Sequence, residues 1–405
     1  MSKTGPLKGL KVIELAHVMA GPACGRMLAD LGADVIKLER PGGEDSRHMA
    51  PPYLGTDSAA YVMMNRGKRD ICVDLKNATG KQLFLDIVAD ADILIENFRK
   101  GTMERLGLGY DALHRHNPKL IYCEISGYGR TGPMAEEGGF DLMAQAMSGL
   151  MSFTGEGPGR PPVKVGAPVA DIGAGLLATI GVLAALQERD QSGLGQKVDT
   201  SLFEAALFQT LWQSAIFLAS GDVPEAMGSA HPLDGPYQAF KTSDDWIVIG
   251  AANQANWLRL LTVLEAKHLG EDPRFKDNPS RMRNLDALVQ ELNTLLEKID
   301  AATWLNRLAE GGVPAAPILS MDSVLKHPQT LARDMVVDVD HAELGSTRTL
   351  GLPIKFSRTP GKVSDSSSPR LGEHAREILE EAGWTAEDID RAFTEGALSK
   401  SQSLD

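Results

Sequence analysis

Short apolar runs alternate with helical stretches along the N-terminal part of the chain. Residues 11–15 form one such run, and residues 22–31 follow as a helical stretch that starts with a proline and ends before Gly32. A second apolar run at residues 34–38 completes a strand, helix, strand unit. The alternation continues with apolar runs at 69–75, 91–95 and 120–125 and a helical stretch at 80–88. The pattern predicts an α/β fold with a parallel, doubly wound sheet.

The pattern changes beyond a long apolar segment at residues 171–186. Residues 200–219 carry aromatic and aliphatic side chains at helical spacing, and the Pro- and Gly-containing stretch 221–236 predicts a linker. A second domain then follows, with a hairpin-like segment at 237–249, helices at 256–264 and 283–298, and a return near 313–318.

The last part of the chain is mostly extended at residues 336–356, with a Pro- and Ser-rich connector at 359–370 and a charged helix from about Gly372. We find no internal repeat. The expected organisation is a large domain whose first part is residues 1–200, a helix and linker at 201–230, a smaller α+β domain at 231–325, and a linker and C-terminal return to the large domain at 326–405.

Composition and charge narrow the classes of function. The chain has 405 residues, 43% of them hydrophobic, and a net charge of −13, which disfavours non-specific binding to nucleic acid or to anionic membranes. The N-terminus has no apolar signal core, and the apolar run at 172–186 is shorter than the roughly 20 residues of a membrane span. We therefore expect a soluble, cytoplasmic protein.

The three cysteines, Cys24, Cys72 and Cys123, lie far apart and lack the spacing of metal ligands. This usage indicates a reducing compartment and argues against a structural zinc site. We expect the three thiols to be buried as small hydrophobic side chains.

Asp171 stands at the start of the apolar segment. An Asp carboxylate, with an ordinary pKa of about 3.9, is already ionised at neutral pH and needs no neighbouring base to attack a carbonyl carbon. The local sequence favours a simpler role, because Asp is also a preferred helix N-cap. The two roles are compatible, since a helix N-terminus also stabilises developing negative charge.

Polar residues follow the predicted strands where open α/β sheets hold ligands. His17 follows the first strand, but Gly21, Gly25 and Gly32 do not have dinucleotide spacing, which disfavours a nicotinamide enzyme. A lone histidine more often satisfies a backbone group than acts as a catalyst. Asn97 and Arg105 follow a later strand, where a polar loop with a capping Asn is the simpler interpretation.

Arg40 and Arg47 lie close together after the second strand of an otherwise acidic chain. A guanidinium group suits a phosphate, because its planar fork binds two oxygens at once and can stack on an adenine. Ordinary ion pairs with Glu39, Glu44 or Asp45 explain the same residues equally well.

Taken together, the motifs resemble the class III CoA-transferase (CaiB/BaiF) family, from about residue 7 to the terminal helix near 374. The resemblance rests on Asp171 and on the motifs at residues 17–22, 36–40, 65–69, 74–76, 96–98, 126–129 and 132–133. It implies a Rossmann-like large domain, a smaller domain, and two chains interlocked as a homodimer. Acyl-CoA and carboxylic acids would be the substrates, with no metal or permanently bound cofactor.

The resemblance also implies roles for individual residues. Asp171 matches the family nucleophile, which forms a mixed anhydride with the donor acyl group and then an aspartyl-CoA thioester. Met19, Phe140, Asp141 and His231 fall near the expected substrate. The residues that match CoA contacts are His17, Val18, Ala20, Arg40, Arg47, Val73, Leu75, Asn97, Phe98, Arg105 and Leu106.

Other functions stay open at this stage. The first alternative is a CoA-ester isomerase like the α-methylacyl-CoA racemases. These racemases of the same family use a histidine where this chain has Phe140, and a phenylalanine cannot carry a proton. A non-catalytic acyl-CoA-binding partner is the third possibility. The presence of Asp171, which matches the family nucleophile, disfavours it.

The chain looks more like succinyl-CoA:dicarboxylate (glutarate-type) transferases than oxalate transferases, because Met19 replaces a glutamine and residues 228–231 replace a polyglycine loop. His231 or Arg99 would bind the distal carboxylate of such an acceptor, unless both are ordinary surface residues.

Overall fold

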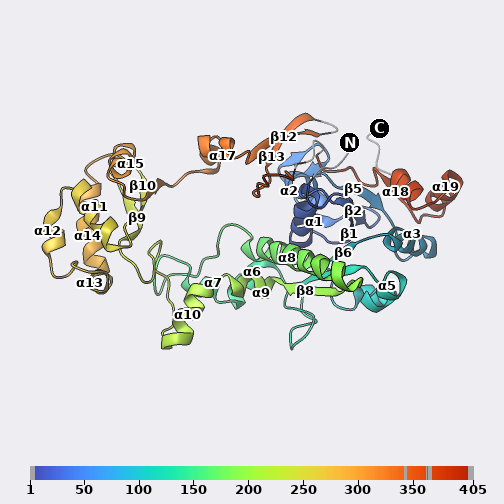
Figure 1. Ribbon diagram of the computed structural model, residues 1–405, viewed down its shortest axis with the longest axis horizontal. Helices are drawn as coiled ribbons and strands as arrows, with labels where there is room; N and C mark the ends of the chain where they lie inside the picture. Colours follow the sequence, from blue (N-terminus) through green and yellow to red (C-terminus); the bar gives the residue numbers. More distant parts are fainter. Residues whose placement is uncertain (1–4, 342–343, 362, 364–366, 400–405) are drawn as a thin grey trace. The chain divides into compact units, whose positions relative to one another are not determined.

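The computed structural model describes residues 5–341, 344–361, 363 and 367–399. Predictions for residues 1–4 and 400–405, and for part of the connector at 359–370, lie outside the described residues. The chain divides into two compact units (Figure 1). Unit 1 comprises Met1–Leu150, Lys164–Ala215 and Pro328–Asp405, and unit 2 comprises Met151–Val163 and Ile216–His327.

Unit 1 is built on a six-stranded sheet in the order β5-β2-β1-β6-β7-β8. Every neighbouring pair is parallel, which confirms the predicted parallel sheet. The chain order reverses between β1 and β6, and the crevice beyond the strand ends at such a reversal is where open α/β sheets bind ligands. The strands are β1 (Lys11–Glu14), β2 (Asp34–Glu39), β5 (Arg69–Cys72), β6 (Ile93–Glu96), β7 (Ile121–Ser126) and β8 (Lys197–Ser201).

Helices cover both faces of this sheet (Figure 1). On one face, Ile13 and Leu15 belong to an apolar core that also holds Phe84 of α3 (Ala78–Ala89), Leu113 of α5 (Tyr110–His116) and Leu379 of α18 (Ala375–Glu381). On the other face, α1 (Ala20–Asp30) packs between the sheet and α8 (Val169–Ser192). Strand residues alternate between the two faces, which explains why β1 contributes to both.

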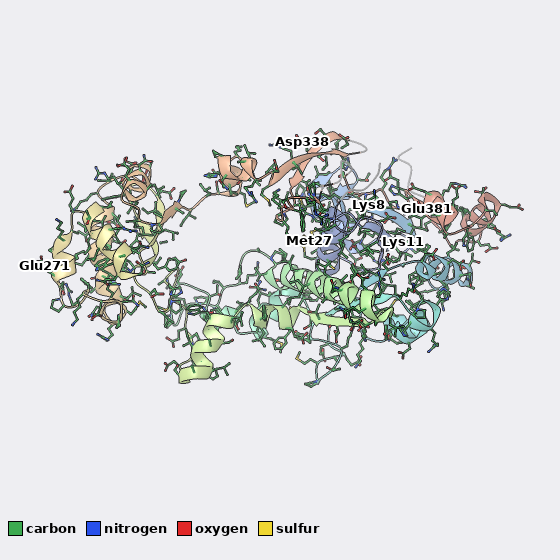
Figure 2. The ribbon with its side chains drawn as sticks, in the orientation of Figure 1. Lys8, Lys11, Met27, Glu271, Asp338 and Glu381 are labelled. Carbon is green, nitrogen blue, oxygen red and sulfur yellow. The ribbon has the colours of Figure 1, made fainter. Side chains whose placement is uncertain are left out.

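The remaining elements of unit 1 are shorter. A hairpin of β12 and β13 accounts for the extended run that the sequence predicts at 336–356. Figure 2 adds the side chains to the ribbon, from Lys11 at the start of β1 to Glu381 at the end of α18. These elements are η1 (Asp45–His48), β3 (Tyr53–Leu54), β4 (Asp57–Ser58), α2 (Ala59–Asn65), α4 (Thr102–Arg105), α6 (Asp141–Met147), α9 (Leu202–Phe208), α17 (Pro328–Ala332), β12 (Val336–His341), β13 (Gly345–Leu350) and α19 (Ala386–Thr394), while α7 (Leu150–Phe153) and α10 (Leu211–Ser220) cross the boundary between the units.

Unit 2 has its own core. β9 (Tyr237–Lys241) and β10 (Trp246–Gly250) form the predicted hairpin, and β11 (Ala315–Pro317) adds to it antiparallel. Fully buried side chains such as Trp257, Phe240 and Leu288 join this sheet to the surrounding helices. The helices are α11 (Gln254–Val263), α12 (Lys267–Glu271), α13 (Asn278–Arg283), α14 (Leu285–Leu296), α15 (Ala301–Glu310) and α16 (Met321–Val324).

The helix α8 is longer than the apolar segment predicts. It begins at Val169 after Pro168 and ends at Ser192, where Gly193 adopts a left-handed φ of 77°. Its length and composition would suffice for a membrane span, a property that core helices of soluble proteins share. Here one side of α8 packs on α1, β7 and β8, so it is part of the core of unit 1.

The three cysteines are free and buried, as the sequence predicts. Burial raises the pKa of the Cys24 thiol to about 12, with a smaller opposing effect from Thr179. At neutral pH this thiol is protonated, and it packs in the core as a small apolar side chain.

The close approach of α1 to the sheet depends on Gly25. A Cβ atom at this position would overlap Oε2 of Glu14, which is fully buried in β1 and ion-paired at 2.7 Å with Nζ of Lys68. Neither partner can move without leaving a buried charge unpaired. Gly25 therefore allows a helix to lie directly over a buried ion pair.

We predict that Gly25→Ala lowers the free energy of unfolding by roughly 1–3 kcal/mol, because the added methyl group forces α1 away from Glu14. Denaturant unfolding followed by circular dichroism measures this change. Gly166→Ala is the matched control, since a Cβ there meets no atom within 4 Å, and it should change stability by at most about 1 kcal/mol. Equal effects of the two substitutions would contradict the packing argument.

Candidate active site

The loops after β1 and β6 meet at the reversal of strand order. The backbone N–H of His17 donates to Oδ1 of Asn97 at 2.8 Å, and Nδ2 of Asn97 donates to the carbonyl oxygen of His17 at 2.9 Å. The His17 ring packs edge-on against Phe98, with 4.9 Å between ring centroids. Three of the residues predicted to lie in the crevice are thus in direct contact.

The imidazole of His17 is half-buried, and burial lowers its pKa, although the nearby Glu44 carboxylate opposes this effect. The ring is therefore predominantly neutral at pH 7. A neutral ring beside Phe98 suits an apolar or thioester group better than it suits a phosphate.

Val18 has an unusual backbone conformation. Its φ of 64° lies in the left-handed region, which a β-branched side chain rarely occupies. Its N–H donates to Oε2 of Glu44 at 2.6 Å. Met19 follows as the N-cap of α1, with no side-chain hydrogen bond to the helix, and Ala20 is buried in the first turn.

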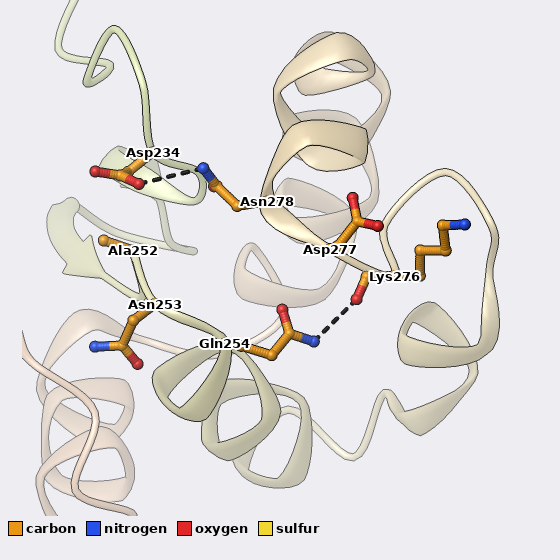
Figure 3. A pocket seen from close by; sticks show the side chains of 7 residues that line it. All are labelled: Asp234, Ala252, Asn253, Gln254, Lys276, Asp277 and Asn278. Atoms are coloured by element: carbon orange, nitrogen blue, oxygen red, sulfur yellow. Dashed lines mark hydrogen bonds between the residues drawn. The ribbon is translucent and has the colours of Figure 1, made fainter.

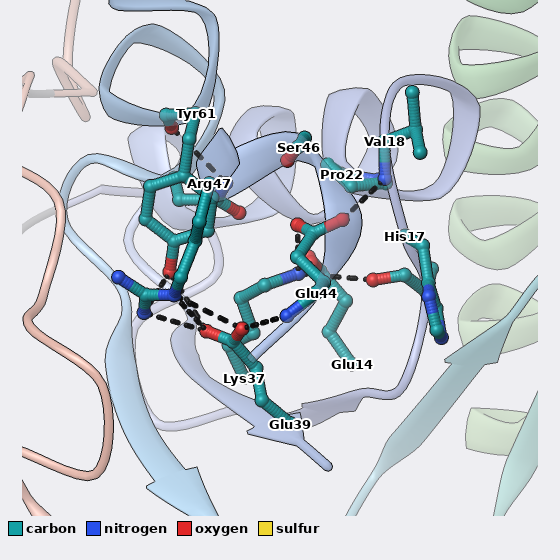
Figure 4. A network of polar contacts seen from close by, with 12 residues as sticks. Glu14, His17, Val18, Pro22, Lys37, Glu39, Glu44, Ser46, Arg47 and Tyr61 are labelled. Atoms are coloured by element: carbon teal, nitrogen blue, oxygen red, sulfur yellow. Dashed lines mark hydrogen bonds and ion pairs between the residues drawn. The ribbon is translucent and has the colours of Figure 1, made fainter. Parts of the chain in front are cut away.

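The two arginines after β2 have different surroundings. Arg40 is exposed and pairs with the exposed Asp45, while its Nε donates to the carbonyl oxygen of Gly43 at 3.0 Å. Arg47 is buried, with Nη2 2.6 Å from Oε1 of Glu39 and Nη1 2.8 Å from Oδ2 of Asp57 (Figure 4). A direct contact between Arg47 and a phosphate would require its guanidinium to leave these carboxylates.

The other predicted CoA contacts line the same edge of the sheet. Arg105 is exposed and donates to Oγ1 of Thr102 at 2.9 Å. Phe98, Leu75 and Leu106 are partly buried against the core of unit 1. Val73 is itself buried, its N–H donates to the carbonyl oxygen of Glu39, and Leu398 pairs with it as an antiparallel bridge.

The N-terminus of α8 is capped from another helix. The backbone N–H of Ala170 donates to Oδ1 of Asp141 at 2.9 Å, and Nε2 of Gln145 donates to Oδ2 of the same carboxylate at 2.7 Å. Asp171 is not the N-cap, which corrects the simpler role that the local sequence favours: it lies one residue inside this contact, in the first turn of α8.

The carboxylate of Asp171 receives no hydrogen bond or ion pair from residues 5–341, 344–361, 363 and 367–399. Burial raises the pKa of Asp171 to about 6, and the negative charge of Asp141 adds to this effect. The group is ionised for the most part at pH 7 but is more basic than an exposed aspartate. It is therefore a carboxylate with the basicity that a nucleophile or a base requires, in the first turn of a helix.

Helix α8 brings Asp171 to the same side of the sheet as the loop at His17. Gly175, one turn after Asp171, packs so closely on α1 that a Cβ would lie 2.6 Å from the carbonyl oxygen of Ala20. Phe140, at the start of α6, is 71% exposed beside this end of α8. The arrangement places a carboxylate next to a loop with uncapped helix N–H groups, which suits attack on a carbonyl carbon.

His231 belongs to unit 2. Its backbone N–H donates to the carbonyl oxygen of Tyr237 at 3.0 Å, its ring stacks on Tyr237, and its Nδ1 lies 3.6 Å from Oδ2 of Asp234. Unit 2 also has a pocket of about 590 Å³, in which no predicted site residue lies (Figure 3). Its lining residues are Asp234, Ala252, Asn253, Gln254, Lys276, Asp277 and Asn278.

Three contributors to the site are absent from the sequence-based prediction of site residues. The sequence indicates Glu44 only as an ion-pair partner of Arg40 or Arg47, and Gln145 carries no recognisable signal. Lys37 did carry one, because a lysine in the middle of an apolar strand indicates a buried acidic partner.

Comparisons with known proteins by family model, by sequence and by structure agree with one another. The family model of CoA-transferase family III matches residues 7–375. Succinate–glutarate CoA-transferase from Agrobacterium fabrum is 38% identical over 396 residues, which cover 96% of this chain and 98% of that protein. Acetyl-CoA:oxalate CoA-transferase from Acetobacter aceti is 38% identical over 378 residues, covering 93% and 96%. The crystal structure of a CAIB/BAIF family protein from Brucella suis has a TM-score of 0.85 at 41% identity, covering 94% of this chain and 100% of that one.

We predict that the Asp171 carboxyl titrates with a midpoint near pH 6 and that Asp141→Asn moves this midpoint to lower pH. Removing a neighbouring negative charge makes ionisation easier, so the sign is downward, while burial keeps the midpoint above the ordinary value. Carbon NMR of protein labelled at the aspartate carboxyl carbons measures both midpoints, with Asp171→Asn to assign the signal. An unchanged midpoint in Asp141→Asn would contradict the electrostatic argument.

Proposed function

The chain belongs to CoA-transferase family III, and on this premise we propose that it moves CoA from a short acyl-CoA thioester, such as succinyl-CoA, to a dicarboxylic acid through Asp171. The observation that carries the proposal is the uncommitted carboxylate of Asp171, with a pKa raised to about 6, in the first turn of α8. An acyl transfer of this kind needs an ionised carboxylate that no other side chain holds.

In the proposed mechanism, the carboxylate of Asp171 attacks the carbonyl carbon of the donor thioester. The C–S bond breaks, which gives a mixed anhydride and CoA thiolate. The thiolate then attacks the aspartyl carbonyl of the anhydride, releases the donor acid as a carboxylate, and leaves an aspartyl-CoA thioester. The acceptor carboxylate repeats the two steps in reverse and regenerates the carboxylate of Asp171.

The surroundings of Asp171 support these steps. Each attack places negative charge on a carbonyl oxygen, which backbone N–H groups at a helix N-terminus stabilise. The start of α1, where Met19 provides no side-chain cap, lies beside α8 and is the proposed source of such groups. Mixed anhydrides hydrolyse readily, so the site must also exclude water, and Phe140 is the side chain that we propose covers it when substrate is bound.

We propose that the CoA moiety lies along the edge of the sheet between the loops after β1, β2 and β6. The exposed guanidinium groups of Arg40 and Arg105 are the candidate phosphate contacts, since each is accessible to a ligand. The acyl chain would then pass the neutral ring of His17 on its way to Asp171. Arg47 would support the loop from behind rather than contact the phosphates.

The acceptor is proposed only as a dicarboxylic acid. The relative named for glutarate and the relative named for oxalate are both 38% identical to this chain, so overall similarity does not separate these two acids. Met19, in place of the glutamine of oxalate transferases, favours the longer acid.

We also propose that two chains form the interlocked homodimer typical of this family, in the cytoplasm. Unit 1 has an apolar face on α6, α8 and α9, which pack against one another. Ile172, Leu176 and Ile180 repeat every four residues along one side of α8 and are each at least 40% exposed. An apolar face of this kind requires a partner, and a second copy of the chain is the proposed one.

We predict that a mixture of succinyl-CoA and hydroxylamine converts Asp171 into a hydroxamate, because hydroxylamine captures the aspartyl thioester or anhydride. Peptide mass spectrometry identifies the modified residue. Asp171→Asn should give no hydroxamate and should lower the transfer rate by roughly a thousandfold or more.

The matched control for this prediction is Asp141, the adjacent carboxylate, which should stay unmodified. Transfer to glutarate, oxalate and propionate, measured by chromatography of the CoA esters, identifies the acceptor class. Normal transfer without any modification of Asp171 would refute the covalent route.

A second prediction concerns the apolar face. Ile180, which is 62% exposed, would be buried in the homodimer, and Ile180→Glu should lower the yield of assembled dimer on refolding by more than about tenfold. Light scattering of the protein refolded from denaturant measures the change. Leu194→Glu is the control, because Leu194 is similarly exposed but lies beyond the end of α8. Equal dimerisation of the two variants would exclude this face.

A further inference from the structure

Lys37 is buried in the middle of β2, where its ammonium group contacts two carboxylates and a backbone carbonyl group. Its Nζ lies 3.1 Å from Oε1 of Glu14, 2.9 Å from the carbonyl oxygen of Ala16 and 2.9 Å from Oε1 of Glu44 (Figure 4). Burial alone would lower the pKa of Lys37, but the two carboxylates outweigh it and raise the pKa. The lysine is therefore a fixed positive charge between two buried carboxylates.

Glu44 is held between this charge and the loop after β1. Its side chain is buried, one oxygen pairs with Lys37, and the other accepts the N–H of Val18. Its own backbone N–H donates to Oε2 of Glu39 at 2.7 Å, which fixes the start of the side chain as well. Residues of β2 thus hold both the backbone and one carboxylate oxygen of Glu44, while its other oxygen binds the loop after β1.

The bond from Val18 to Glu44 acts on a strained residue. For a valine, a conformation with a φ of 64° is several-fold less populated than the extended conformation, because the branched Cβ crowds the backbone. A short hydrogen bond to a buried carboxylate is among the stronger contacts available to a backbone N–H. Strained residues of this kind persist where the surrounding structure holds them, and they concentrate at functional sites.

We propose that Glu44 is a positioning residue for CoA transfer: by binding the N–H of Val18, it holds this residue in its left-handed conformation and so sets the loop from His17 to Ala20 beside Asp171. The proposal rests on the proposed function only for the identity of the reaction that the loop serves. Glu44 itself does not touch the reacting atoms.

The carboxylate is required because both of its partners are donors. In Glu44→Gln the amide has one oxygen for two donors, and the charged Lys37 is the stronger donor, so the oxygen turns to Lys37 and Val18 faces an NH₂ group. Glu44→Asp keeps the charge beside Lys37 but is one methylene shorter, so it cannot reach both partners. Both substitutions free Val18 to relax toward extended backbone.

The test is a mutant cycle between positions 44 and 18, read as kcat and KM for transfer from succinyl-CoA. We expect Glu44→Gln and Glu44→Asp to lower kcat/KM by about tenfold or more, because a displacement of the loop misplaces the thioester relative to Asp171. Val18→Gly alone is the reference of the cycle, since it removes a side chain that lies among the CoA contacts while glycine adopts a left-handed φ readily. In the Val18→Gly background, either Glu44 substitution should lower kcat/KM by at least threefold less than it does in the unmodified protein.

Glu14→Gln is the matched control. Glu14 is equally buried and pairs with the same lysine, but it makes no bond to the loop. It should lower thermal stability as Glu44→Gln does, yet Val18→Gly should give it no recovery of kcat/KM. If the Glu44 substitutions lower kcat/KM as much in the Val18→Gly background as in the unmodified protein, or if Val18→Gly reduces the effect of Glu14→Gln equally, Glu44 has only a structural role and the proposal is wrong.

Hydrogen exchange gives a readout that does not depend on the reaction. A peptide containing Val18 should exchange faster in Glu44→Gln than in Glu14→Gln, because only the former loses the acceptor of that N–H. Unchanged exchange in Glu44→Gln would overturn the proposal. Absence of transfer or of the Asp171 hydroxamate in the unmodified protein would instead refute the proposed function, while the exchange result would still decide the role of Glu44.

Discussion

The arrangement of the site depends on the buried charges around Lys37. Burying a charge is unfavourable unless its partners are complete, and here the lysine has three acceptors while Glu44 has two donors. Loss of one partner of such a buried pair costs about 3–5 kcal/mol, mostly because it leaves the other charge uncompensated. The network therefore tolerates little rearrangement, and it transmits the geometry of β1 and β2 to the loop that carries His17.

Much of the fold and the general location of the site could be predicted from the sequence, for a simple geometric reason. Parallel strands end at one edge of a sheet, so polar residues that follow separate apolar runs must gather there. The contact between His17 and Asn97 across 80 residues is a direct consequence. Short apolar runs and helical periods are local signals, which explains why β1, β2 and the hairpin of unit 2 lie close to the predicted ranges.

What could not be predicted is which polar residues face one another across elements. Asp171 resembled an N-cap because capping rules use neighbouring residues, whereas the cap of α8 comes from Asp141, on α6. For Arg47 the sequence left a phosphate contact and an ion pair with Glu39 open, and it did not show that Asp57 joins Glu39 around a buried guanidinium group. Both cases depend on tertiary contacts that composition and spacing do not encode.

The exchange of roles between the two aspartates has a chemical consequence. Because Asp141 satisfies the helix, Asp171 retains its lone pairs, and the neighbouring negative charge adds to burial in raising its pKa to about 6. Nucleophilic strength increases with basicity, yet at pH 7 a group with this pKa is still about nine-tenths ionised. A lower pKa would give a weaker nucleophile, and a higher one would leave it protonated, so the pair of carboxylates places Asp171 between these limits.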